Sequence, residues 1–476
     1  MKTVYRAHPL MIIKLSKPFL IVLVFPLLRA LLQYLAKGEI KGLVTFEIIA
    51  ILMILGLAVA RFFTFRVYCD DKTVTVRQGV IFVRKSEIEI AKLSSVQTER
   101  TPIDYLCGAM TFRINTEAGT KNRPDFEFKL NFSRGKELSK QLYSDEPVSK
   151  QRFSAVKIAV MAATTSSAFT GLIIGVPIIN RAGNLFGIAL SEMLFNEINN
   201  VSSKFETHFP PIVNTITLIF LLAYAVSFIY SFCKYLSFKV ILGENQLEVR
   251  SGFFSKCRTA FKKSSVNNVL IVQTPLMLLF KRFAMKVSVG GFGESKSESQ
   301  IVVPSGKYEE IKKDFSLYFP FLTPNGNPII PKRSLLCESR FLFWPGVCLL
   351  ILLALAIPSA VYFANFTHFV LFLTFVCFAL IAFYAYISIL EYKHTSIEFG
   401  ENIFAKGVKG FRTRELYCPK EKVGQIRLTR FFTDFYYKTC KIKLTICSEN
   451  ADSIHLRHLD YETARRNIFN CFGIEE

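Results

Sequence analysis

Six nearly uncharged apolar stretches constrain this chain more than any other feature of its sequence. They cover residues 18–36, 43–60, 158–179, 212–232, 341–363 and 369–390. Each stretch has roughly the length that a helix needs to cross the hydrocarbon core of a bilayer, about 20 residues. Buried helices of a soluble core would need six such runs without a polar face, so we interpret the chain as an integral membrane protein.

The composition agrees with this division into apolar and charged segments. The chain has 476 residues, of which 51% are hydrophobic, and it carries a net charge of +22. These two properties must occupy different segments, so basic domains are expected between the spans. The 11 cysteines are scattered without a Cys-x-x-Cys pair, which indicates reduced structural thiols.

Lysine and arginine beside the apolar stretches predict the orientation. Such residues stay on the cytoplasmic side of a membrane when they flank a span. They gather before the first stretch and after each even-numbered stretch, as Lys2, Arg6, Lys14, Lys17, Arg61, Arg66, Lys234, Lys239 and Lys393. The pattern predicts a multi-pass protein of the cell membrane with three hairpins, in which both termini and all large domains are cytoplasmic.

The segments after the hairpins repeat one another. The pattern apolar-x-Val-Arg-x-Gly occurs at 74–79 and again at 247–252, and a Thr-Pro pair follows 22 residues after each glycine, at Thr101 and Thr274. A third copy is more diverged, with Val-Gly-Gln-Ile at 423–426 in place of 93–96 and 266–269. It carries Phe431-Phe432 where the others have Thr-Pro.

Alternation of apolar and polar residues predicts short antiparallel strands in each copy. Each copy then closes with a helical pattern, at 136–143, 308–318 and 461–472. The predicted fold class is an α+β membrane protein with six transmembrane helices in three hairpins, each followed by a split β-barrel with a C-terminal helix. The expected segments are 1–64 (leader and hairpin), 65–150 (domain), 151–236 (hairpin with an outer loop at 181–211), 237–325 (domain), 326–392 (linker and hairpin) and 393–476 (domain).

Three segments carry a resemblance to a known family, namely 74–79, 88–97 and 116–119, with weaker echoes in the other copies. In these the chain resembles the bacterial pleckstrin-homology (PH) membrane proteins of the YdbS/YdbT type, as a large member with three repeats. The resemblance implies PH-like barrels. It also implies a membrane-protein partner, because large members often accompany a smaller family member.

Basic residues between the first two strands of each copy are the candidate binding site for lipid or partner. They are Arg77, Arg84 and Lys85 in the first copy, Arg250, Lys256, Arg258, Lys262 and Lys263 in the second, and Lys406, Lys409, Arg412 and Arg414 in the third. The corresponding loop of eukaryotic PH domains binds phosphoinositide head groups, which the resemblance suggests here. Each cation near an anionic leaflet contributes on the order of 1 kcal/mol. A positive-inside flank without any ligand is the alternative explanation.

Patterns typical of catalysis are sparse. His455 and His458 are three residues apart in a predicted strand-to-helix connection, which is not the spacing of a helical zinc pair, so a solvated connection is favoured over a metal site. The glycine-rich stretch at 289–294 lacks the Lys-Ser/Thr of a phosphate loop and is better explained as a hairpin turn. We therefore expect no enzyme activity, no metal or other cofactor, and no nucleic-acid partner.

Two ionisable residues fall within the predicted spans, Arg29 and Glu47. They either pair across the short hairpin turn or extend separately to the interface. Within the outer loop, residues 185–196 either form an amphipathic helix on the outer surface or an ordinary connection.

These features predict a non-enzymatic scaffold or sensor at the membrane surface, which assembles with membrane partners or anionic lipids. A transport or lipid-handling protein gated by the basic domains is the alternative. Flux of a lipid or peptide through vesicles would favour transport, and partner capture without flux would favour the scaffold.

Overall fold

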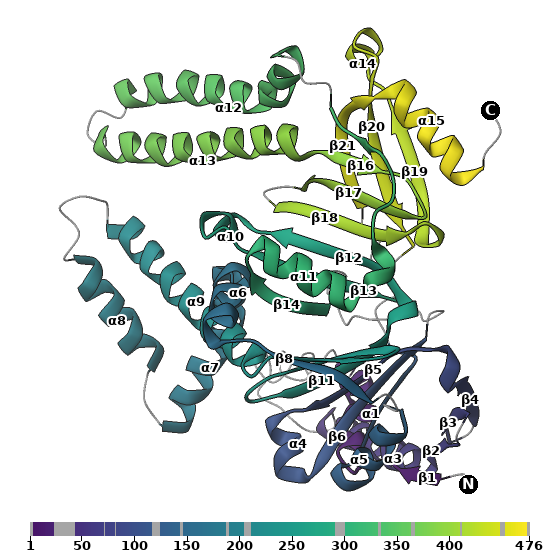
Figure 1. Ribbon diagram of the computed structural model, residues 1–476. Coiled ribbons are helices and arrows are strands. Elements are labelled where there is room, and N and C mark those ends of the chain that lie inside the picture. The colour runs from purple at the N-terminus through teal and green to yellow at the C-terminus, as the bar shows by residue number, and fades with distance from the viewer. Residues whose placement is uncertain are drawn as a thin grey trace. The chain divides into compact units, whose positions relative to one another are not determined.

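The computed structural model describes residues 3–22, 43–70, 72–80, 82–116, 124–142, 146–186, 190–203, 211–290, 300–331, 335–362, 367–409, 412–447 and 453–473 (Figure 1). The chain divides into two compact units. The first contains residues 1–151, 239–265 and 289–298, and the second contains residues 152–238, 266–288 and 299–476. The middle copy of the repeat is therefore divided, since its first strands belong to one unit and its later strands to the other.

The first copy folds within the first unit as two small sheets and a closing helix. The first sheet has the order β1-β2-β3-β4. The elements are β1 (Thr3–Arg6), β2 (Arg66–Cys69), β3 (Thr73–Gln78), β4 (Arg84–Glu89), β5 (Leu93–Arg100), α4 (Pro102–Cys107), β6 (Ala109–Thr116), β7 (Phe126–Asn131) and α5 (Phe132–Leu142). Inward residues of both sheets and of α5 form one apolar core, in which Phe112 and Phe128 stack with their ring centroids 5.6 Å apart.

A seven-stranded sheet in the first unit joins the first copy to the second. Its order is β7-β6-β5-β11-β10-β9-β8. The strands from the second copy are β8 (Pro147–Arg152), β9 (Lys239–Gly243), β10 (Gln246–Ser251) and β11 (Lys256–Lys262). Strand β5 pairs antiparallel with β11, so two copies of the repeat share one sheet.

The second unit repeats this joint between the second and third copies. Its seven-stranded sheet has the order β14-β13-β12-β18-β17-β16-β15. From the second copy come β12 (Val266–Gln273), α10 (Pro275–Leu279), β13 (Phe283–Val289), β14 (Gln300–Gly306) and α11 (Tyr308–Tyr318). From the third come β15 (Pro328–Ile329), β16 (Ser396–Glu398), β17 (Asn402–Lys409) and β18 (Arg412–Pro419).

The third copy ends in a separate three-stranded sheet closed by a helix. The order is β19-β20-β21, formed by β19 (Val423–Thr429), α14 (Phe432–Tyr436), β20 (Thr439–Ile446), β21 (Ser453–Asp460) and α15 (Tyr461–Phe472). The helices α11 and α15 have the bounds predicted from the sequence, and α5 covers most of the predicted 136–143. Short 3-10 turns at Ile90–Lys92, Lys263–Ser265 and Lys420–Lys422 stand at equivalent places between the two halves of each copy.

Each copy begins one strand earlier than the sequence indicated. The strands β1, β8 and β15 precede their apolar helices in the chain and join the first sheet of their own copy. The apolar helices of each copy therefore lie between its first and second strands in the chain. The strands hold both ends of the insertion together, because β1 pairs with β2 in the first copy and β15 pairs with β16 in the third.

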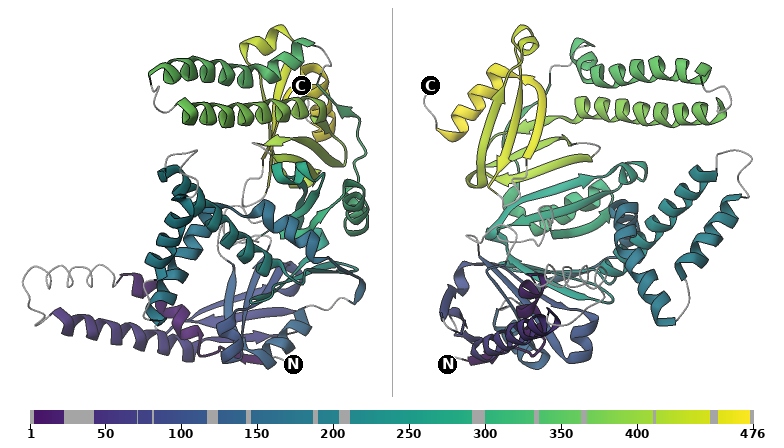
Figure 2. Two further views of the ribbon diagram at one scale, coloured as in Figure 1. Left: turned by 90° about the vertical axis from the view of Figure 1, so that its left-hand side faces the viewer. Right: turned by 180° about the vertical axis from the view of Figure 1, so that it is seen from behind.

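The prediction of six spans in three hairpins is not supported. Three of the described helices contain segments long and apolar enough to cross a membrane: α9 (Pro211–Tyr235), α12 (Leu335–Tyr362) and α13 (Thr367–His394). The last two run side by side in both views of Figure 2. In the predicted first hairpin, α1 (Met11–Val22) is described only as far as Val22, because residues 23–42 lie outside the described part of the chain. In α3 (Leu43–Thr64), the apolar segment Leu52–Thr64 is shorter than a membrane span.

The third predicted span, 158–179, is a pair of helices bent by 95° rather than one helix. The pair consists of α6 (Ala155–Thr165) and α7 (Ala168–Phe186). The hydroxyls of Thr164, Thr165 and Ser166 donate hydrogen bonds to carbonyls of the preceding turn, and Ser166 takes an extended conformation. Such local bonds compete with the helix and end it, which hydropathy alone does not register.

The remaining intramembrane and outer-loop predictions lie partly outside the described residues. Arg29 is not described, and of Glu47 only the backbone is described, within α3. Of the two alternatives for 185–196, the structure has helix in the described part, as the end of α7 at Phe186 and the start of α8 (Leu190–Ser203).

Candidate membrane-facing surface

The hairpin between β3 and β4 lies at the end of the sheet where the apolar helix α3 enters it. Helix α3 ends at Thr64, and Arg66 at the start of β2 pairs with Arg77 near the end of β3. The turn that follows β3 is therefore next to the helix end. A cavity of about 260 Å³ lies between them, lined by Leu15, Arg61, Phe65, Gln78, Gly79, Phe82 and Arg84.

The tip of this hairpin carries exposed apolar side chains between basic ones. Phe82 is 89% exposed, and Val80 and Val83 are also exposed. Arg84 and Lys85 follow at the start of β4, and both are exposed. An aromatic tip with cationic flanks is the composition that favours the interface between lipid head groups and acyl chains.

The second copy repeats this arrangement at 252–255. Strand β9 begins at Lys239, shortly after α9 ends, and Lys239 pairs with Arg250 before the turn. Phe253 and Phe254 at the tip are 58% and 61% exposed, with their rings 5.0 Å apart. In the third copy Ser396 pairs with Lys406 after α13, but the tip residues 410–411 lie outside the described residues.

A glycine makes these tips possible. Gly79 and Gly252 have φ angles of +122° and +110°, which residues with a Cβ adopt at a cost. A Cβ on Gly252 would stand 1.9 Å from the carbonyl oxygen of Ser255, and one on Gly79 would stand 1.9 Å from that of Phe82. The final glycine of the repeated sequence pattern is thus required by the turn itself.

A second group of exposed apolar residues belongs to the short helices α4, α10 and α14. The Thr-Pro pairs found in the sequence are the starts of two of them, with Thr101 and Thr274 as N-caps and the prolines at the first helical position. The third copy starts its helix without Thr-Pro and keeps only the carboxylate half of the first copy's cap: Asp434 accepts a hydrogen bond from the Phe431 N–H at 3.0 Å, as Asp104 does from the Thr101 N–H at 3.1 Å. The exposed apolar residues are Ile103, Tyr105 and Leu106 on α4, Leu276, Leu279 and Phe280 at α10, and Phe431, Phe432, Phe435 and Tyr436 at α14.

These short helices also lie beside the ends of apolar helices. In the first copy, His8 just before α1 is 3.0 Å from the Cys107 carbonyl oxygen of α4 through its Nε2. In the second unit, α10 packs against α6. In the third copy, the ring of Phe341 in α12 lies 4.9 Å from that of His458, whose Nδ1 is 3.8 Å from the Asp434 carboxylate of α14.

Several predicted site residues in the second copy have structural partners. Arg250 and Arg258 pair across β10 and β11, and both contact Glu248, with the Arg258 Nη2 donating at 2.9 Å. Lys262 donates to the Ile90 carbonyl at 3.1 Å and also to that of Ala91. The site candidates in this strand pair therefore hold the sheet together as well as carrying charge.

Two more cations of the second copy and Lys406 of the third copy have similar roles. Lys263 donates to the carbonyls of Gly243 and Glu244, at 2.9 and 2.7 Å. Lys256 lies 5.5 Å from the centre of the Tyr105 ring. In the third copy Lys406 forms an ion pair with the buried Glu415 at 2.7 Å, Arg414 is half-buried, Arg412 is exposed, and the side chain of Lys409 is not described.

In the first copy the predicted cations remain at the surface. Arg77 pairs in register with Lys85, Gln78 pairs with Arg84, and all three cations are exposed. Lys85 forms an exposed ion pair with Glu87 at 3.2 Å. Exposed pairs of this kind contribute little to stability, about 0–1 kcal/mol, so these cations can exchange partners.

The charge of Glu248 couples the stability of the second hairpin to pH. Burial opposes ionisation of this carboxyl, but the neighbouring Arg250 and Arg258 outweigh it and hold the pKa of Glu248 below its ordinary value of 4.5. Its stabilising contribution is complete above that value and is lost as the pH falls through the lower folded pKa.

We expect the exchange protection of the β10 and β11 amides to fall as the pH is lowered from about 5 to about 3, and to fall more steeply in the wild type than in Glu248→Gln. The reason is that the wild type loses the Glu248 charge by protonation, whereas glutamine has no charge to lose. Hydrogen–deuterium exchange of the full chain, corrected for the intrinsic pH dependence of exchange, measures this. Glu244→Gln, a change at an exposed residue beside the same hairpin, should behave as the wild type. Equal slopes in wild type and Glu248→Gln would contradict the assignment.

Sequence reasoning missed a buried pair beneath α4. The Asp104 carboxylate is fully buried, forms a capping box with Thr101 and accepts a hydrogen bond from Lys129 Nζ at 2.6 Å. Burial opposes its ionisation, yet the bonds from Lys129 and Thr101 lower the pKa of Asp104. A carboxylate three residues after Thr101 was the available sequence signal.

The third copy has the corresponding pair in Asp434 and His458, whereas the second has Met277 and Ser305. Counting from the first residue of β5, β12 and β19 places Asp104, Met277 and Asp434 at one position. His458 is buried in β21 and has a φ of +59°. The interpretation of the His455–His458 stretch as a solvated connection was therefore wrong.

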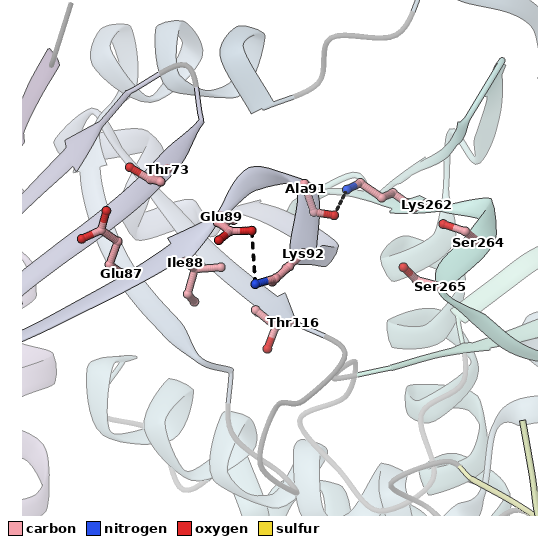
Figure 3. A pocket seen from close by; sticks show the side chains of 10 residues that line it. All are labelled: Thr73, Glu87, Ile88, Glu89, Ala91, Lys92, Thr116, Lys262, Ser264 and Ser265. Carbon is pink, nitrogen blue, oxygen red and sulfur yellow. Dashed lines mark hydrogen bonds and ion pairs between the residues drawn. The ribbon is translucent and has the colours of Figure 1, made fainter.

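Figure 3 shows a cavity of about 570 Å³ in the first unit, beside β4. Its cations are engaged, since Lys92 pairs with Glu89 at 3.2 Å and Lys262 donates to a backbone carbonyl. Within the described residues no group of three or more His, Cys, Asp or Glu side chains is placed to hold a metal ion.

Comparison with known proteins gives one match. The family model described as "Bacterial PH domain" matches residues 19–146 and 187–313, which together are more than half of the chain. No curated protein and no solved structure matches the chain. The two matched ranges cover most of the first two copies of the repeat, including both hairpin tips and both Thr-Pro helices. The chain therefore belongs to the bacterial PH domain family.

Proposed function

We propose that this protein is a membrane-anchored scaffold whose PH-like domains rest on the anionic cytoplasmic leaflet through their hairpin tips and short helices. One observation carries the proposal. In both described tips, exposed phenylalanines lie between cations, and the strand that pairs with the base of each tip begins within four residues of the end of an apolar helix in the chain. The cytoplasmic side follows from the excess of Lys and Arg beside the apolar helices.

The energetics favour contact by several weak sites together. One or two exposed aromatic rings with neighbouring cations bind a leaflet weakly and reversibly. Apolar helices in the same chain keep the tips at the membrane, so each contact forms at a high effective concentration. The scaffold would present its remaining surfaces to other membrane proteins, for which a smaller family member is the first candidate.

A dye that reports polarity tests leaflet contact in the full chain. We propose to label Phe254→Cys in lipid nanodiscs containing anionic lipid, with the exposed Cys107 and Cys447 replaced by serine. Because the tip enters the head-group region, its emission should be blue-shifted and quenched by lipids with a shallow nitroxide. The matched control is Ser264→Cys, an exposed site at the other end of the same strand pair.

The two sites must differ for the proposal to stand. Emission and quenching at Phe254→Cys equal to those at Ser264→Cys would overturn the leaflet contact. Replacing Arg250 and Lys256 by glutamine separates the electrostatic contribution from the apolar one. The loss of charge attraction should weaken the blue shift in anionic but not in neutral nanodiscs.

A further inference from the structure

The joint between consecutive copies is built twice with one register. In the first joint Val96 of β5 lies opposite Ala260 of β11. In the second joint Val269 of β12 lies opposite Tyr417 of β18. Val96 and Val269 occupy equivalent positions, each three residues after the first residue of its strand. Ala260 and Tyr417 are also equivalent, because each lies six residues before the first residue of the next strand in the chain. The joint is therefore a specific connection and not a chance contact.

The joint buries the strands that form it. All eight residues of β12 are buried, and five of the eight residues of β5. Leu270 and Val272 extend from β12 into the apolar core of the third copy, beside Leu416. One copy thus supplies part of the core of the next, so the connection combines backbone pairing with burial of side chains.

The first and third copies each have one strand of the kind that forms this joint at the end of a sheet, among the described strands. Strand β4 corresponds to β11 and β18, and it ends its sheet among the described strands. Strand β19 corresponds to β5 and β12, and it also ends its sheet. No residue of β4 or β19 is buried, although the strands at the same positions in the two joints have three to eight buried residues each.

We infer that β19 of one molecule pairs antiparallel with β4 of a second copy of this chain. An edge strand with free N–H and C=O groups is a template for such pairing. A second copy is the occupant that offers the matching half at both ends, and a head-to-tail contact of this kind is heterologous and can repeat. The register of the internal joints places Ile426 opposite Glu87, Arg427 opposite Ser86 and Thr429 opposite Arg84.

The charges on β4 do not prevent this pairing. The two internal strands at its position are also charged, with Lys256 and Arg258 in β11 and Arg414 in β18. In the first joint Lys256 even lies opposite Arg100. Arg100 is accommodated because its guanidinium stacks on the rings of Tyr105 and Phe132, 3.9 Å from each centre.

This inference rests on the proposed scaffold role, for which it names the partner, and a crosslink between differently tagged chains tests it. One full-length chain carries Arg427→Cys and the other carries Ser86→Cys, both with Cys107 and Cys447 replaced by serine, co-expressed in membranes. Opposed residues of antiparallel strands have the Cα separation that a disulfide needs. We expect a disulfide-linked dimer containing both tags.

The matched control moves one cysteine by a single residue. Lys85→Cys in place of Ser86→Cys points to the other face of β4 and should yield on the order of tenfold less mixed dimer. Equal yields, or no more mixed dimer than from either single cysteine alone, would overturn the proposal. Capture of a different protein by Arg427→Cys without mixed dimer would also overturn the second copy as occupant.

Failure here is distinguishable from failure of the scaffold proposal. Leaflet contact is read at Phe254, which belongs to neither β4 nor β19. A blue-shifted tip with no mixed dimer would keep the scaffold and discard this joint. A mixed dimer with a fully hydrated tip would do the reverse.

Discussion

Gly252→Ala should destabilise the second hairpin tip by about 3 kcal/mol or more. The new Cβ meets the Ser255 carbonyl oxygen at 1.9 Å, and this neighbour is backbone that cannot rotate away. The φ of +110° adds a second cost for any residue with a Cβ. The turn must therefore change shape, which displaces Phe253 and Phe254. Hydrogen–deuterium exchange of β10 and β11 in the full chain measures the loss of protection.

Gly108→Ala is the matched control, because it separates strain from collision. Gly108 also has a positive φ, +67°, but a Cβ there would have nothing within 4 Å. The equivalent positions in the other copies hold Lys281 and Lys438, each with a φ of +51°. We expect a cost of about 1 kcal/mol at Gly108. Equal effects at the two glycines would contradict the argument that the tip requires glycine for space.

Asp104→Met should destabilise the first copy by about 3 kcal/mol, since it leaves the Lys129 ammonium without its buried partner. Lys129 is only 19% exposed on its side chain, so water replaces the carboxylate poorly. The substitution also removes the reciprocal cap with Thr101 at the start of α4. Thermal unfolding of the full chain in detergent and exchange protection of α4 and β7 measure the effect.

The second copy supplies the control for this substitution. It has Met277 and Ser305 at the positions of Asp104 and Lys129. The double variant Asp104→Met/Lys129→Ser reproduces that neutral pair and should recover a large part of the loss, because no charge remains buried. If the double variant were as unstable as the two single changes added together, the pair would not be coupled.

The two predictions probe different consequences of one arrangement. In the first copy the tip and the short helix α4 each lie beside an end of an apolar helix, the tip held by a glycine turn and the helix by its cap. Exposed phenylalanines at such places are costly in water and favourable at a leaflet. Loss of the turn or of the cap should therefore reduce both stability and leaflet contact.

Much of the strand and helix pattern was predictable from the sequence. The segments with alternating apolar and polar residues form strands. The helices predicted at 308–318 and 461–472 have these bounds in the structure, because their periodic apolar faces pack on a core. The role of the Thr-Pro pair as a helix start was not predictable from the two copies alone. The third copy lacks the threonine half of this cap and keeps only the carboxylate half, in which Asp434 accepts a hydrogen bond from the Phe431 N–H as Asp104 does from the Thr101 N–H in the first copy.

The basic residues of the candidate site could be identified from the sequence, but their contacts could not. The Lys and Arg positions in the first hairpins were identified, yet Lys262 and Lys263 proved to bind backbone carbonyls, and Lys406 a buried carboxylate. The exposed phenylalanines were overlooked, because an apolar residue in a strand-rich region is ordinarily assigned to the core. Their position at the hairpin tips became clear only from the register in which the strands pair.

The sequence by itself determined that this chain has apolar helices, basic β-rich domains between them and a threefold repeat, because hydropathy and periodicity are local properties of the chain. Only the tertiary structure decided that each copy begins before its apolar helices and that neighbouring copies share a sheet. Both depend on which strand edges meet, through backbone hydrogen bonds between segments more than 100 residues apart, as with β5 and β11. Backbone groups are the same in every residue, so the sequence carries little record of which strand they pair with.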